Sequence, residues 1–183
     1  MLKVTVCTFW FVFLVIEIIL FFKNRNKARY RMNNKFIILS MIYSAVVAVF
    51  IIYIIYNQNL QFLYKSTALN GYIFKLTGLV LVCLGLFIAI YTRLYMAGNW
   101  SPSILPNGNH ELITKGPYAF LRHPLYFGVI IALAGNAVIF AGHWILILFV
   151  AFIFLLIKIR EEEKYLKEKY GLLYQQYAKK VII

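Results

Sequence analysis

The sequence is short of negative charge and of cysteine, and each shortage excludes a class of protein. Its 183 residues include 6 acidic residues against 19 Lys and Arg, which gives a formal net charge of +13. Such an excess is typical of soluble nucleic-acid-binding proteins, but the basic residues lie between apolar runs, so no nucleic-acid partner is predicted. Cys7 and Cys83 lack the spacing of a zinc site or a disulfide framework. No metal and no oxidising compartment are therefore predicted, and both thiols are expected to be buried packing residues.

Apolar residues are abundant enough that lipid must be part of the solvent. They make up 63% of the chain, and the mean hydropathy is +0.78. A membrane-spanning helix needs about 20 apolar residues, and three stretches satisfy this: residues 4–22, 36–56 and 72–91. A further stretch, 125–157, is interrupted at Ala141-Gly142-His143, which predicts a helical hairpin. We therefore predict an all-α, polytopic membrane protein with five transmembrane helices, the last two forming the hairpin.

The loop charges predict the orientation of these helices. Six basic residues lie between Lys23 and Lys35, in a short loop where positive charge marks the cytosolic side. This places the N-terminus outside and residues 93–124 and the C-terminus inside, so that 16 of the 19 basic residues are cytosolic. Residues 4–22 lack the charged n-region and the cleavage site of a signal peptide, so they are expected to remain as an anchor.

Glycine recurs every seven residues in two of the predicted helices. One stripe is Gly71, Gly78 and Gly85, and the other is Gly128, Gly135 and Gly142, with Ala132 between. Small residues at helical spacing let membrane helices approach closely. The third and fourth spans are therefore predicted to pack along these stripes.

The chain ends in a polar segment, residues 160–180, with Leu and Tyr at helical spacing. We expect a cytosolic amphipathic helix there. No linker or repeat divides the sequence, so residues 1–183 are expected to form one integral membrane domain. Within it, residues 1–70 are a two-helix region and residues 71–183 are the core that holds the chemistry.

Two polar segments remain once the spans are removed, residues 98–127 and 158–177, and both lie on the predicted cytosolic face. The first contains all four prolines and several glycines, so it is expected to be a loop able to wrap a small polar ligand. A catalytic site should use both segments.

The two segments carry motifs of a known family. The string GPYAFLRHPLYFG, residues 116–128, resembles the GPY…RHPxYxG signature of the isoprenylcysteine carboxyl methyltransferases and their prokaryotic relatives. The string KIREEEKYLKEKYGLLYQQY, from Lys158, resembles the EExxL…FGxxYxxY tail of that family. Asn99-Trp100-Ser101 and the His110–Ile113 segment also look like the prokaryotic members. The resemblance spans about residues 98–178.

The resemblance implies an S-adenosylmethionine-dependent methyltransferase that binds its cofactor without a Rossmann fold, and no GxGxxG motif occurs here. Matched to the motifs, the cofactor-binding residues are His110, Glu111, Leu112, Ile113, Tyr118, His123, Pro124, Leu125, Tyr126 and Glu162. A carboxylate such as Glu162 can pair with the ammonium group of the cofactor.

Three cations are candidates for orienting an anionic acceptor: Arg122, Lys158 and Arg160. Where eukaryotic carboxyl methyltransferases carry Arg four residues before the cofactor Glu, this sequence has Lys158. Because Lys lacks the planar two-pronged grip of Arg, this departure weakens the inference to a prenylcysteine carboxylate but leaves the inference to S-adenosylmethionine intact.

The resulting hypothesis is methyl transfer to a lipophilic carboxylate, thiol or hydroxyl at the cytosolic face of a prokaryotic cell membrane. The alternatives are a phospholipid N-methyltransferase, an NADPH-dependent membrane reductase and a non-catalytic scaffold. Among the other ionisable residues, Glu161 and Glu163 are expected to be solvated, and Glu17 is expected to reach toward the cytosolic surface from the first span.

Overall fold

The computed structural model describes residues 2–25, 71–96, 112–140 and 144–182. In these ranges the chain is helical, with no β-strand: α1 (Leu2–Arg25), α4 (Tyr72–Met96), α5 (Pro124–Phe140), α6 (Trp144–Tyr170) and α7 (Leu172–Lys180), together with the short 3-10 helix η4 (Gly116–Ala119). The predicted span at residues 36–56, the loop at 26–35 and the hairpin tip at 141–143 lie outside the described residues.

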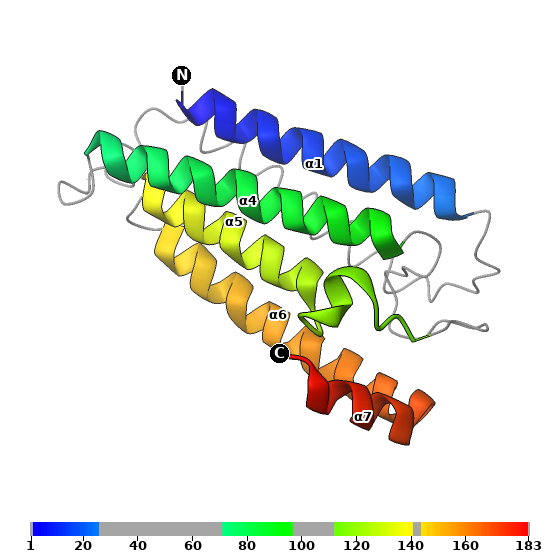
Figure 1. Cartoon of the computed structure of the whole chain (residues 1–183). Helices are drawn as coiled ribbons and strands as arrows, with labels where there is room; N and C mark the ends of the chain where they lie inside the picture. The colour runs from blue at the N-terminus through cyan, green and yellow to red at the C-terminus, as the bar shows by residue number, and fades with distance from the viewer. Residues whose placement is uncertain (1, 26–70, 97–111, 141–143, 183) are drawn as a thin grey trace.

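The four long helices pack in the order α1, α4, α5, α6, each against the next (Figure 1). The η4 turn lies against α4 near the end of the bundle where α6 extends and α7 folds back. The predicted all-α class is therefore confirmed for the described residues. The predicted hairpin is also present as two helices, α5 and α6, on either side of residues 141–143.

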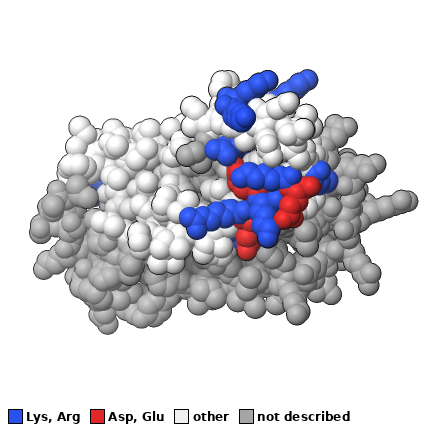
Figure 2. Space-filling view, turned by 90° about the horizontal axis from the view of Figure 1, so that it is seen from below, with Lys and Arg blue, Asp and Glu red and all other residues white. Residues whose placement is uncertain are grey.

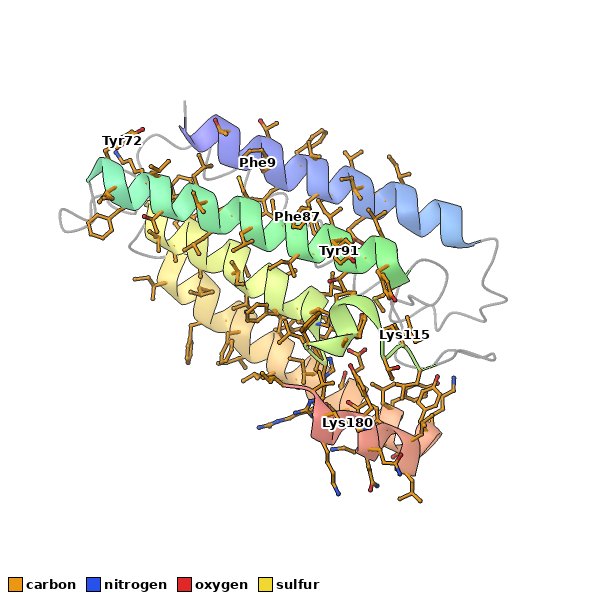
Figure 3. The ribbon with its side chains drawn as sticks, in the orientation of Figure 1. Phe9, Tyr72, Phe87, Tyr91, Lys115 and Lys180 are labelled. Carbon is orange, nitrogen blue, oxygen red and sulfur yellow. The ribbon has the colours of Figure 1, made fainter. Side chains whose placement is uncertain are left out.

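Of the helices within the described residues, α4 alone is long and apolar enough to span a membrane. Shorter apolar helical stretches are Thr8–Ile19 in α1 and Pro124–Phe140, which is α5. Large apolar side chains are exposed on α4 and along the first half of α6, where lipid would cover them. Phe87 and Tyr91 mark such a face on α4 (Figure 3). Cys83 lies on α4 and is also exposed, so the expectation of a buried packing thiol is wrong for this residue.

The helices α4 and α5 pack along the two glycine stripes, as the sequence predicts. A Cβ at Gly78 would lie 2.8 Å from the carbonyl oxygen of Gly135, and a Cβ at Gly135 would lie 2.6 Å from that of Gly78. A Cβ at Gly85 would collide with the backbone nitrogen of Ala132. The backbones are thus too close for any side chain at these positions. Within the described residues, a Cβ at Gly71, the first glycine of the stripe, would meet only the side chain of Phe74, so Gly71 takes no part in this contact.

The polar tail, residues 160–180, was predicted to be one separate helix, and this prediction is wrong. Instead α6 continues from its apolar half through the acidic triplet to Tyr170, and the chain breaks at Gly171 before α7 begins. Gly171 has a φ of 52°, in the left-handed region that glycine adopts without steric cost. The break lets α7 fold back toward the start of α5, whereas a continuous helix would have carried it away.

An ion pair joins the N-terminal helix to α4. The Nε of Arg93 donates to an Oε of Glu17 at 3.0 Å, and the Arg93 side chain is fully buried. Glu17 therefore does not reach toward the aqueous surface as predicted but pairs inside the bundle. Phe9, Trp10 and Phe13 of α1 pack against the core formed by Val82, Leu86, Ala132 and Ile139.

Candidate active site

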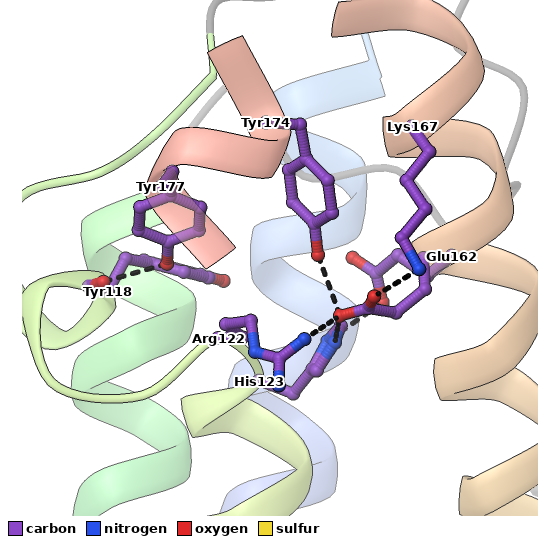
Figure 4. Close-up of polar contacts among 8 residues, drawn as sticks. Tyr118, Arg122, His123, Glu162, Lys167, Tyr174 and Tyr177 are labelled. Carbon is purple, nitrogen blue, oxygen red and sulfur yellow. Dashed lines mark hydrogen bonds and ion pairs between the residues drawn. The ribbon is translucent and has the colours of Figure 1, made fainter. Parts of the chain in front are cut away.

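The two polar segments of the sequence meet at one end of the bundle (Figure 4). The segment from η4 to the first turn of α5 contributes Tyr118, Arg122, His123 and Tyr126. The extension of α6 contributes Glu162 and Glu163, and α7 contributes Tyr174 and Tyr177. Residues more than 40 positions apart in the sequence therefore form one polar cluster, as a shared site requires.

Glu162 lies among three of the residues predicted to bind the cofactor. Its Oε2 is 3.6 Å from Nδ1 of the buried His123. Burial first and the charge of Glu162 second raise the pKa of the Tyr126 phenol, whose ring stacks on His123. The phenol of Tyr118 is also affected by this carboxylate: burial first and the charge of Glu162 second raise its pKa. The tyrosines are thus neutral donors that surround a partly exposed carboxylate.

Glu163 is the centre of the hydrogen-bond network, and the expectation that it is solvated is wrong. Its Oε1 accepts from Nη1 of Arg122 at 2.9 Å and from the hydroxyl of Tyr174 at 2.7 Å, and lies 3.3 Å from Nε2 of His123. Its Oε2 lies 3.3 Å from Nζ of Lys167. Burial raises the pKa of Glu163, but the hydrogen bonds from Tyr174, His123 and Lys167 and the charge of Arg122 outweigh it, so the net pKa is lowered.

His123 therefore lies between two carboxylates. One ring nitrogen faces Glu162 and the other faces Glu163, and the ring stacks on Tyr126 with 5.9 Å between centroids. Pro124 follows directly and begins α5, a position where proline is pre-organised for a helix. The Arg-His-Pro string thus places the imidazole at the helix start, with each ring nitrogen facing a carboxylate.

The helix α7 is tied across this cluster. The hydroxyl of Tyr177 donates to the backbone oxygen of Tyr118 at 2.7 Å, and burial raises the pKa of Tyr177 to about 12, which keeps the hydroxyl protonated. The N–H of Arg122 donates to the backbone oxygen of Ile182 at 3.0 Å. The last residues of the chain therefore hold the loop that precedes α5.

The predicted acceptor-orienting cations are not brought together. Arg122 is committed to Glu163, and Lys158 lies 3.5 Å from Glu161 one turn away. Arg160 is exposed on α6. Glu161 is exposed, so the expectation that it is solvated is confirmed.

The remaining predicted residues have mixed placements. Leu112 and Ile113 are half-buried and lie in irregular chain ahead of η4, and Leu125 is half-buried in the first turn of α5. His110 and Glu111 lie outside the described residues.

The sequence analysis missed three residues of the cluster: Glu163, Tyr174 and Tyr177. The tyrosines were counted as part of an amphipathic face, and both are buried against the site. Their spacing of three residues was a usable signal, because it puts both hydroxyls on one face of a helix. Glu163 gave no such signal, since only the tertiary fold brings Arg122 and Tyr174 to it.

The donor set of this cluster fits a ligand that carries an ammonium group. A partly exposed carboxylate can bind an ammonium group, and the neutral tyrosines and the imidazole can donate or accept hydrogen bonds around it. Half-buried apolar residues, among them Ile113 and Leu125, can shield a reacting centre from water. S-Adenosylmethionine, with its ammonium, carboxylate and apolar sulfonium substituents, is compatible with these groups.

Sequence comparison identifies relatives of this chain. Protein-S-isoprenylcysteine O-methyltransferase of Schizosaccharomyces pombe is 31% identical over 113 residues, which are 60% of this chain and 48% of that protein. Protein-S-isoprenylcysteine O-methyltransferase B of Arabidopsis thaliana is 36% identical over 75 residues, 40% of this chain and 38% of that protein. An uncharacterised protein of Bacillus subtilis is 33% identical over 94 residues, 50% of this chain and 56% of that protein. The chain thus spans less than half the length of the two methyltransferases.

The sequence pattern of a family matches half of the chain. This family is described as isoprenylcysteine carboxyl methyltransferase (ICMT), and the match covers residues 76–168. The matched range begins within α4, includes η4 and α5, and ends within α6, five residues after Glu163. The match therefore contains the elements that build the polar cluster except α7, which follows it and carries the end of the family-like tail string, and this chain belongs to the isoprenylcysteine carboxyl methyltransferase family.

Proposed function

We propose that this protein transfers a methyl group from S-adenosylmethionine to a lipophilic acceptor at the cytosolic face of a membrane. The observation that carries this proposal is that Nδ1 of His123 lies 3.6 Å from Oε2 of Glu162. Burial and the charge of Glu162 also raise the pKa of the phenols of Tyr118 and Tyr126. These residues come from the two motifs that resemble the family, and they meet although they are far apart in the sequence. The relatives named as protein-S-isoprenylcysteine O-methyltransferases support the same class of reaction.

The chain's own residues have positioning roles in this proposal. When bound, S-adenosylmethionine supplies an electrophilic methyl group. Glu162 binds an ammonium group, and His123, held between Glu162 and Glu163, keeps that carboxylate in place. No general base is needed if the acceptor is a carboxylate, because it is already ionised at neutral pH. The protein then contributes chiefly by alignment and by exclusion of water.

The acceptor is proposed to be apolar over most of its length. The exposed apolar faces of α4 and α6 would lie in lipid, and both helices lead to the polar cluster at their cytosolic ends. A molecule dissolved in the bilayer could therefore approach the site sideways while a polar cofactor arrives from the cytosol. This route suits a lipid-modified thiol, carboxylate or hydroxyl.

Calorimetric titration of the purified full-length protein tests the cofactor. We expect S-adenosylhomocysteine to bind and NADPH not to bind. Glu162→Gln and His123→Ala should weaken S-adenosylhomocysteine binding at least tenfold, since each removes a charge-assisted contact worth about 1.5–3 kcal/mol. Glu168→Gln, an exposed carboxylate on the same helix, is the matched control. Binding of NADPH alone would favour a reductase instead, and unchanged affinity in both variants would remove Glu162 from the site.

A further inference from the structure

The segment that follows the family match forms a strap over the polar cluster. This C-terminal strap, residues 172–182, consists of α7 and the two residues after it, whereas the match ends at residue 168. Three hydrogen bonds tie it down: Tyr174 to Glu163, Tyr177 to the backbone of Tyr118, and the Arg122 N–H to Ile182. The strap therefore contacts both motifs of the candidate site.

The end of the strap lies where an apolar helix begins. Leu121 and Ile182 form a parallel β-bridge. Leu121 lies two positions before His123 and three before Pro124, where α5 starts. All but one of the 17 residues of α5 are apolar or small, so in a membrane the first turn of α5 would lie near the edge of the hydrocarbon region. Ile182 and its neighbours would then lie at the level of the lipid headgroups.

Exposed apolar and basic side chains occur together at this level. Phe120, next to the bridge residue Leu121, and Ile182, the other bridge residue, are each 75% exposed. Lys179 and Lys180 are exposed at the end of α7, and Lys115 is exposed just before η4. Lys115 and Lys180 lie at the same end of the molecule, opposite Tyr72 (Figure 3). Large apolar groups next to lysines are typical of protein surfaces that insert into a membrane interface.

The charge of the strap is not balanced within its own helix. The α7 sequence, LLYQQYAKK, contains two lysines and no acidic residue. Among the described residues, the carboxylates of Glu161, Glu162 and Glu163 form ion pairs with Lys158, His123, Arg122 and Lys167, not with Lys179 or Lys180. Figure 2 shows Lys and Arg gathered with these carboxylates toward one end, while the described surface toward the other end is almost wholly uncharged. Lysines at headgroup level attract anionic lipid.

We propose that Phe120, Lys179, Lys180 and Ile182 form a binding surface for anionic phospholipid headgroups. Lipid bound there fastens the strap, because the same segment carries Tyr177 and the Ile182 carbonyl that hold Tyr118 and Arg122. Cofactor affinity therefore rises when the membrane contains anionic lipid. This last step rests on the proposed function, whereas the lipid-binding surface does not.

Native mass spectrometry of the full chain tests the surface directly. The protein is released from nanodiscs of phosphatidylcholine mixed with phosphatidylglycerol, and the retained lipids are counted. Lys179→Gln/Lys180→Gln should retain phosphatidylglycerol about tenfold more weakly than the unmodified protein. The control is Lys164→Gln/Lys169→Gln, which makes the same charge change at two exposed positions of α6. These positions lie about 10 and 18 Å beyond Ile157, the last residue of the apolar half of α6, and so farther from the hydrocarbon region. An equal loss of retained phosphatidylglycerol in both double variants, or no loss in either, overturns the proposal that Lys179 and Lys180 bind anionic lipid.

The coupling to the site has its own readout. S-Adenosylhomocysteine affinity is measured by calorimetry in nanodiscs of phosphatidylcholine alone and of the mixture. The unmodified protein should bind several-fold more tightly in the mixture, and Lys179→Gln/Lys180→Gln should bind equally in both. Equal affinity of the unmodified protein in both lipids overturns the coupling. Absence of S-adenosylhomocysteine binding in either lipid overturns the proposed function and the coupling together, while the retained lipid count still decides the surface.

Discussion

At the scale of single residues, Glu163 organises the site more than any other side chain described. It receives Arg122 and Tyr174, contacts His123, and lies within 3.3 Å of Lys167. We expect Glu163→Gln to lower the free energy of unfolding by about 2 kcal/mol, because hydrogen bonds to a charged group are the stronger kind and Arg122 loses its counter-ion. Thermal unfolding in detergent measures this. Glu168→Gln is the control, and an equal change in the control would show that Glu163 has no special role.

The pH dependence of stability provides a second test of Glu163. Its pKa in the folded protein is lowered from the ordinary value of 4.5. A lowered pKa stabilises the fold above the unfolded value, and this contribution is lost as the pH falls through the folded value. The stability difference between the unmodified protein and Glu163→Gln should therefore shrink as the pH falls below 4.5 and the carboxylate becomes protonated. A difference that keeps its full size down to the lowest pH at which the protein stays folded would contradict a lowered pKa of Glu163.

Residue roles were predictable from the sequence only where a motif carried them. His123 and Glu162 were identified from the family-like strings, and the structure brings them within 3.6 Å of each other. Glu163 was assigned to solvent, because three adjacent glutamates look alike in a sequence. A helix rotates successive residues by about 100°, so the partners of each depend on the packing around α6. That packing is tertiary information.

At the scale of the helices, the α4–α5 contact should be the least tolerant of larger residues. A Cβ at Gly85 would collide with the backbone of Ala132 and Gly128, which no side-chain rotation can relieve. Gly85→Val should therefore destabilise the protein by about 3 kcal/mol, the upper part of the range for overpacking. Thermal unfolding of purified protein checks this. Gly71→Val is the control, since among the described residues only the flexible side chain of Phe74 is near that position. Tolerance of Val at Gly85 would mean that the two helices do not pack this closely.

The link between α1 and α4 is a second helix-scale prediction. Glu17→Leu removes the partner that the fully buried Arg93 contacts at 3.0 Å. We expect a loss of about 3 kcal/mol, the lower end for a broken buried ion pair, because Glu17 keeps some exposure. Val12→Leu, at an exposed position of the same helix, should change stability little. Unfolding midpoints equal in both variants would contradict a stabilising role for the pair.

Helix boundaries were predictable from the sequence where apolar runs were uninterrupted. The third span was expected at residues 72–91 and is observed as Tyr72–Met96. The polar tail was less predictable, since α6 continues past its apolar half. Its glutamates and lysines are good helix formers that do not end a helix, so the chain breaks only at Gly171. The ion pair between Glu17 and Arg93 was also unpredictable, because their 76-residue separation shows no local pattern.

At the scale of the whole molecule, the membrane orientation inferred from loop charge remains a prediction, and accessible cysteines can test it. Cys7 and Cys83 are first replaced by serine. Single cysteines are then placed at Gly71 and Gln176, which lie at opposite ends of the bundle and are both exposed. With the N-terminus outside, a membrane-impermeant maleimide added to intact cells should label Gly71→Cys and leave Gln176→Cys unlabelled until the cells are opened. The reverse pattern would place the polar cluster outside the cell, away from a cytosolic cofactor, and would contradict the proposed function even if S-adenosylhomocysteine binds in vitro.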